Sequence, residues 1–262
     1  MCHPEVPEGQ PTPQVTTEEV GIPVGGGEEM PAMLALPDRA APGSAPAVLV
    51  VSDVFGRTPF YESLAARIAT AGFEALLPDF FFRVGALPER TREAAMERRE
   101  RLDEQRSLED LRGALRWLRG RAAGGRIGTV GFCMGGTFVL DLAALEPDLV
   151  TVCYYGFPAG AHKTSPTAPP RPLDLADRMR GPILGFWGDQ DAGVGMDNVA
   201  ELARRLEAAG VDFDHRVYPG IGHGFLAASQ FDPENDAYQS ACESWTMALD
   251  LWRHHLRAEA TV

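Results

Sequence analysis

Residues 126–136 (RIGTVGFCMGG) limit the possible folds of this chain more than any other stretch. An apolar, strand-like run over 127–132 meets the motif Gly131-Phe132-Cys133-Met134-Gly135, and helical composition follows over 137–145. A strand that turns into a helix within so few residues strains its apex residue, and it needs glycines two positions to either side to avoid a clash. The motif therefore predicts a tight turn that holds Cys133 above a sheet, where helix N–H groups favour a thiolate. Taken alone, it also fits a small buried cysteine in an ordinary turn.

Short apolar runs alternate with amphipathic stretches along the rest of the chain. The expected strands are 15–24 and 30–36, joined as an antiparallel hairpin by 25–27, then 47–52, 73–77, 127–132, 150–155, 182–187 and 213–218. The expected helices are 59–71, 90–106, 108–121, 137–145, 197–209 and 234–257. This alternation predicts an α/β fold, with a mostly parallel central sheet flanked by helices on both faces.

The length of 262 residues, with 45% hydrophobic and 23% charged residues, is typical of one large α/β domain. We expect a flexible lead-in over the Pro- and Glu-rich residues 1–14 and a single domain over 15–262. The segment 157–172 is long enough for a rim or lid element, and it fits surface padding equally well. No apolar run approaches the roughly 20 residues that span a bilayer, and the first residues do not resemble a signal peptide. We therefore expect a cytoplasmic protein.

The formal net charge of −13 argues against nucleic acid and anionic membranes as partners, because phosphate contacts need clustered basic residues. Arginines do gather over 90–121, but acidic residues alternate with them, which is typical of a solvated, salt-bridged helical face. We expect a small-molecule substrate, with a monomer as the default state.

Four cysteines, Cys2, Cys133, Cys153 and Cys242, are too few and too scattered for a disulfide framework. No pair of them has the spacing of a zinc site or a redox motif. Only one histidine lies where a site is expected, and no cluster of ligands accompanies it, so the sequence does not predict a metal site.

A thiol nucleophile needs a base, and the base needs an acid that fixes its tautomer. Both partners follow Cys133 in the chain, each in a loop directly after an expected strand. His223 lies between glycines in GIGHGF, where it has little packing to do. Asp191 in GDQD is our choice for the acid, and Asp189 is the alternative because the sequence does not say which carboxylate turns inward. The N–H groups of Met134 and Val54 are the candidates for an oxyanion hole.

Six motifs in register resemble the dienelactone hydrolase family, whose members are α/β hydrolases, over nearly the whole chain from about Met30 onward. They are DVFG at 53–56, PDFFFR at 78–83, GFCMGG at 131–136, YYG at 154–156, GDQD at 188–191 and GHGF at 222–225. The resemblance implies hydrolysis of esters and lactones without a cofactor, by a triad of Cys133, His223 and Asp191 through a thioester.

The resemblance also implies two further roles, and the chain departs from the family in both. The family places a glutamate as hydrogen-bond partner of the resting thiol, where this chain has Asp53. Family members hold a substrate carboxylate with two arginines. Arg83 matches the first, whereas the second position is Ala227, and Arg57 is a possible substitute. Phe82 and Phe225 are expected in an apolar wall of the pocket.

Two other functions fit the same residues. One is a promiscuous carboxylesterase that prefers uncharged esters. The other is a thiol sensor or binding module that keeps the fold but does not turn over substrate. Comparing charged with uncharged substrates distinguishes the first, and a reactive thiol without ester turnover distinguishes the second.

Overall fold

A computed structural model describes residues 13–38, 43–121, 126–160, 168–230 and 233–256. Most of the expected lead-in over 1–14, and the middle of the segment 157–172, lie outside the described residues. None of the helices in these ranges has the length and apolar character needed to cross a membrane.

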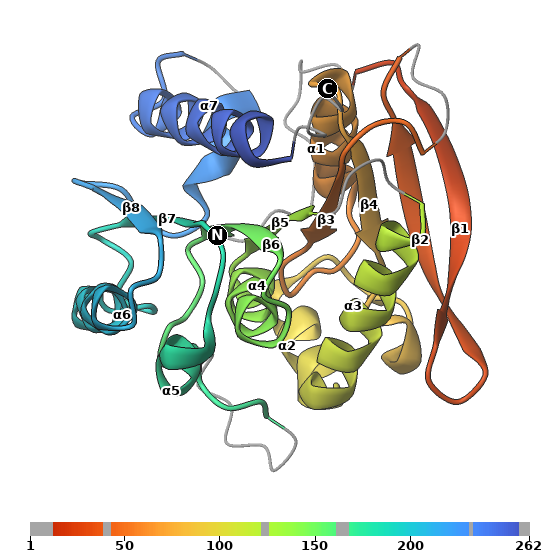
Figure 1. The fold of residues 1–262 in the computed structure, drawn as a ribbon, viewed down its shortest axis with the longest axis horizontal. Coiled ribbons are helices and arrows are strands. Elements are labelled where there is room, and N and C mark those ends of the chain that lie inside the picture. Colours follow the sequence, from red (N-terminus) through yellow and green to blue (C-terminus); the bar gives the residue numbers. More distant parts are fainter. Residues whose placement is uncertain (1–12, 39–42, 122–125, 161–167, 231–232, 257–262) are drawn as a thin grey trace, which may run out of the picture.

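One eight-stranded sheet, in the order β1-β2-β4-β3-β5-β6-β7-β8, forms the centre of the structure (Figure 1). β1 and β2 form the expected antiparallel hairpin and β2 pairs antiparallel with β4, whereas all other neighbours are parallel. The strands are β1 (Thr16–Val24), β2 (Glu28–Leu36), β3 (Ala47–Val51), β4 (Glu74–Pro78), β5 (Ile127–Phe132), β6 (Leu149–Tyr154), β7 (Ile183–Gly188) and β8 (Phe213–Tyr218). The mostly parallel sheet confirms the predicted fold class.

Helices cover both faces of this sheet. In Figure 1, α1 (Pro59–Thr70) and α7 (Tyr238–His255) lie above it, and α3 (Glu104–Arg119), α4 (Met134–Leu145) and α6 (Met196–Ala208) lie below. Every residue of β3, β4, β5, β6 and β7 is buried, as expected for parallel strands covered on both faces. The remaining elements are α2 (Arg92–Glu100), α5 (Pro172–Leu175) and the 3-10 helices η1 (Phe82–Val84), η2 (Ala176–Arg178) and η3 (Phe225–Gln230).

Three expectations about helices need correction. The first charged helix ends at Glu100 and not at residue 106, because the Asp103 side chain caps α3 by accepting a hydrogen bond from the Arg106 N–H at 3.0 Å. The last helix begins at Tyr238 and not at residue 234. The arginine-rich stretch is salt-bridged but not wholly solvated, since Arg98 and Arg99 are buried.

Candidate active site

Cys133 is the single residue between β5 and α4, and its backbone is strained. Its φ of 55° lies in a region that residues other than glycine rarely occupy. The glycines around it are required by space: a Cβ on Gly131 would lie 2.1 Å from the Gly135 carbonyl oxygen, and a Cβ on Gly135 would lie 2.2 Å from the Val51 oxygen. Cys133 is buried among the core residues, with 8% of its surface exposed.

The loops after β7 and β8 bring Asp191 and His223 together. His223 Nδ1 lies 2.5 Å from Asp191 Oδ2, and Asp191 is buried. Its other oxygen, Oδ1, accepts a hydrogen bond from the Val194 N–H at 3.3 Å, which fixes the carboxylate within its own loop. A histidine held through Nδ1 presents Nε2 on the opposite side of the ring, as a general base requires.

Asp189, the alternative acid, has a different place. It is exposed, and its Oδ1 accepts hydrogen bonds from the Gly220 N–H at 2.7 Å and from the Gln190 side chain at 2.9 Å. It therefore links the loops after β7 and β8 from the outside.

The last residue of β6 and the residues after it contact the cysteine and the histidine. The Cys133 N–H donates to the Tyr154 carbonyl oxygen at 3.0 Å, and the Tyr155 ring packs 4.8 Å from the His223 ring, centroid to centroid. Tyr155 has a φ of 40°, and Phe157 packs 5.7 Å from the same histidine. In the sequence, Tyr155 stands out only as part of the family motif YYG, without an expected role of its own. Two aromatic residues before a glycine at the end of a strand were the available signal.

The loop after β3 turns back on itself beside the strained turn at Cys133, which we call the elbow. The Asp53 carbonyl accepts a hydrogen bond from the Gly56 N–H at 3.0 Å, and Asp53 Oδ1 accepts one from the Phe55 N–H at 2.8 Å. By contrast, the N–H groups of Val54 and Met134 donate to no residue within the described ranges, although both residues are buried. Buried N–H groups are rarely left unpaired, so these two donors are available to a ligand atom.

The two candidate substrate arginines already have carboxylate partners. Arg83 donates to both oxygens of Asp110, at 2.9 and 3.1 Å, and also pairs with Glu28. The hydrogen bonds that Arg83 donates to Asp110, with the one to Glu28, outweigh the effect of burial and raise the pKa of Arg83 above its usual value. Arg57 is likewise bound to Glu62 at 2.8 Å and to Glu19.

The predicted aromatic wall is only partly assembled around the histidine. Phe225 is buried and packs edge-on against Tyr155 at 5.6 Å, close to His223. Phe82 is half-buried and lies under the Arg83 guanidinium at 4.5 Å. Ala227, where the second family arginine would stand, lies in η3.

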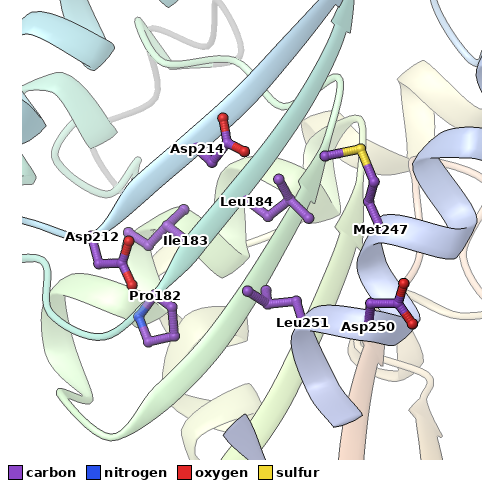
Figure 2. Close-up of a pocket in the computed structure, with 8 residues that line it drawn as sticks. All are labelled: Pro182, Ile183, Leu184, Asp212, Asp214, Met247, Asp250 and Leu251. Atoms are coloured by element: carbon purple, nitrogen blue, oxygen red, sulfur yellow. The ribbon is translucent and has the colours of Figure 1, made fainter. Parts of the chain in front are cut away.

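A separate hollow of about 270 Å³ lies at the other end of β7 and β8, against α7 (Figure 2). It is lined by residues from the starts of the two strands and from the helix, namely Pro182, Ile183, Leu184, Asp212, Asp214, Met247, Asp250 and Leu251. Three aspartates line it, but its lining includes no cysteine, serine, threonine or histidine. Across the described part of the chain, no group of three or more histidine, cysteine or acidic side chains has the geometry of a metal site.

The parallel sheet, the strained elbow after β5 and the paired acid and histidine after β7 and β8 define an α/β hydrolase. Comparison with known proteins narrows this class. Residues 30–256 match the model of the dienelactone hydrolase family. A carboxymethylenebutenolidase of Rhodococcus opacus is 33% identical over 257 residues, which are 98% of each chain.

Two further relatives agree. A Bradyrhizobium protein assigned as a 2-oxo-3-(5-oxofuran-2-ylidene)propanoate lactonase is 33% identical over 90% of this chain and 94% of its own. A Klebsiella pneumoniae crystal structure assigned to the dienelactone hydrolases is 30% identical with a TM-score of 0.81, over 92% of this chain and 99% of that chain. The chain therefore belongs to the dienelactone hydrolase family and is a hydrolase of the carboxymethylenebutenolidase type, as the sequence motifs predicted.

Proposed function

We propose that this enzyme hydrolyses small esters or lactones through a thioester on Cys133, with His223 as the base and Asp191 as the residue that orients it. The observation that carries the proposal is the strained position of Cys133 at the end of β5, with φ at 55° and glycines on both sides that no other residue can replace. Strain of this kind persists where the surrounding structure enforces it, and it clusters at sites of chemistry.

The reaction has two steps. In the first, the Cys133 sulfur attacks the substrate carbonyl while His223 takes the thiol proton. The N–H groups of Val54 and Met134 hold the oxyanion, and the C–O bond breaks as His223 returns the proton to the leaving oxygen. In the second, His223 activates water, which attacks the thioester carbonyl. The C–S bond breaks, the acid is released and the thiol is restored.

We assign Asp53 as the acid beside the resting thiol. It is fully buried in the loop directly after β3, where its Oδ1 accepts a hydrogen bond from the Phe55 N–H. Its side chain is one methylene shorter than the family's glutamate, and the Asp53 carboxylate also serves its own loop. We therefore propose that His223 supplies most of the ionisation of Cys133.

The structure favours a second candidate, a carboxylesterase that prefers uncharged esters. Arg83 and Arg57 are engaged by carboxylates of the protein, and Ala227 carries no charge. A substrate carboxylate would have to compete with Asp110 for the Arg83 guanidinium. Measuring kcat/KM for two lactones, one with and one without a free carboxylate, on wild type and Arg83→Ala separates the two candidates. If Arg83 binds the substrate carboxylate, Arg83→Ala lowers kcat/KM for the charged lactone alone. If it does not, the substitution affects both lactones alike.

Replacing Cys133 tests the shared mechanism. We expect Cys133→Ala to abolish hydrolysis of short p-nitrophenyl esters, and Cys242→Ala, which changes a half-buried cysteine on α7, to retain it. With a slowly hydrolysed ester, mass spectrometry of the wild type should find the acyl group on the peptide that contains Cys133. Normal turnover by Cys133→Ala would refute the mechanism. An alkylatable Cys133 with no turnover on any ester would instead identify a thiol sensor.

A further inference from the structure

One face of α2 covers the loop that follows β3. Ala95 packs with Val54 and Phe55 in a small apolar cluster, separate from the main core. Arg98 lies one helical turn further along α2 and is 4% exposed. A charged residue from a surface helix is therefore buried beside the proposed oxyanion hole.

The Arg98 side chain contacts the loop after β3 through its guanidinium group. Its Nη2 donates a hydrogen bond to the Val54 carbonyl oxygen at 3.2 Å, and its guanidinium lies 4.0 Å from the centre of the Phe81 ring. The same nitrogen lies 3.0 Å from the position that a Cβ on Gly56 would occupy, and Gly56 has a φ of 75°, which favours glycine.

This position is not one that stability alone would favour. Burial lowers the pKa of Arg98, and its Nε makes no hydrogen bond within the described part of the chain. A buried donor without a partner destabilises the folded state. Burying the Arg98 side chain therefore costs free energy of folding, and a buried polar group of this kind calls for an explanation such as a functional role.

The hydrogen bonds fix both peptide planes that flank the Val54 Cα. The peptide before it, which carries the Val54 N–H, is held through the Asp53 carbonyl by the Gly56 N–H at 3.0 Å. The peptide after it is held on both edges, by Asp53 Oδ1 on the Phe55 N–H at 2.8 Å and by Arg98 on the Val54 carbonyl at 3.2 Å. The direction of the Val54 N–H is therefore set before any substrate arrives, as an oxyanion hole requires.

We propose that Arg98 is a positioning residue for the hydrolysis: it holds the Val54 carbonyl and so aims the Val54 N–H at the oxyanion. This role rests on the proposed function, because it assumes that Val54 is an oxyanion donor. Arg98 acts through the loop and does not touch the substrate.

Kinetics of Arg98→Met and Arg98→Lys test the proposal. Methionine keeps most of the packing on Phe81 but cannot donate, so we expect kcat for p-nitrophenyl acetate to fall about tenfold to a hundredfold, with KM little changed. Lysine keeps one donor and should give an intermediate kcat. Added guanidinium should restore part of the activity of Arg98→Ala. The rate of Cys133 alkylation by iodoacetamide should stay at the wild-type value in all three variants, because that reaction forms no oxyanion.

The matched control is Arg99→Met, which removes the neighbouring buried arginine and its ion pair with Glu104 at 3.0 Å. We expect this control to lose thermal stability while keeping kcat. An active wild type together with a folded Arg98→Met that keeps the wild-type kcat would overturn the proposal for Arg98 alone. The proposal would also be overturned if kcat fell equally in Arg98→Lys, if added guanidinium did not raise kcat of Arg98→Ala, and if the rate of Cys133 alkylation fell together with kcat. A wild type with no ester turnover would overturn the proposed function, and the role of Arg98 with it.

Discussion

Asp189 and Asp191 are chemically identical and two positions apart, yet the fold gives them different surroundings. Asp191 is buried and faces His223 at 2.5 Å, whereas Asp189 is exposed and binds the Gly220 N–H at 2.7 Å. A carboxylate orients an imidazole only when water does not compete for it, so the buried aspartate is the one suited to the acid role. This difference leads to a test with two isosteric variants.

We expect Asp191→Asn to lower kcat by about 10⁴-fold, because an amide at Asp191 favours the wrong tautomer of His223. Asp189→Asn should leave kcat near the wild-type value, since the amide oxygen still accepts from the Gly220 N–H. Steady-state hydrolysis of p-nitrophenyl acetate by both variants measures the difference. A larger loss in Asp189→Asn than in Asp191→Asn would transfer the acid role to Asp189.

At the scale of a single element, α4 carries a buried carboxyl group, one oxygen of which has no hydrogen-bond partner among the described residues. Asp141 is 1% exposed, and its Oδ1 makes no hydrogen bond to any residue in the described ranges. Burial, with a smaller effect from the charge of Glu104, raises the pKa of Asp141 well above its ordinary value. The helix that follows Cys133 therefore contains a carboxyl group that keeps its proton to higher pH in the folded state than in the unfolded chain.

This acid makes stability depend on pH. In the unfolded chain Asp141 ionises near pH 4, whereas in the folded chain it remains neutral at higher pH, so unfolding releases a proton. The free energy of unfolding should then fall as pH rises above about 4, and Asp141→Asn should remove that loss. We expect the variant to gain about 1.4 kcal/mol on the wild type per pH unit until the folded pKa is reached. Urea unfolding from acidic to neutral pH measures this, and parallel curves for the two proteins would contradict it.

The elements also differ in how far the sequence predicts them. β3, β5 and the turn at Cys133 follow from local chemistry, because buried parallel strands need continuous apolar runs and the turn needs its glycines. The burial of Arg98 does not. Alternating charges over 90–121 indicate a solvated helix, and its partner, the Val54 carbonyl, lies 44 residues away in sequence. The sequence does not indicate the pairing of Arg83 with Asp110 for the same reason, since it joins η1 to α3 across 27 residues of sequence.

For the whole molecule, the dominant electrostatic feature is an excess of acid. The chain has 37 acidic and 24 basic residues, which gives a formal net charge of −13. The arginines nearest the predicted substrate region do not offset this charge locally, since Arg83 and Arg57 are paired with Asp110, Glu28, Glu62 and Glu19. A substrate that carries a carboxylate therefore approaches against a negative potential, whereas a neutral ester does not.

Salt should reveal this repulsion. The Debye length shortens from about 30 Å at 0.01 M to about 8 Å at 0.15 M, so added salt screens the net charge from an approaching anion. We expect kcat/KM for a carboxylate-bearing lactone to rise about threefold or more over this range, while kcat/KM for a matched neutral lactone stays constant. Initial rates at low substrate concentration measure both. A fall in kcat/KM for the charged lactone would mean that a positive site attracts the carboxylate despite the net charge, and it would restore Arg83 as the residue that binds it.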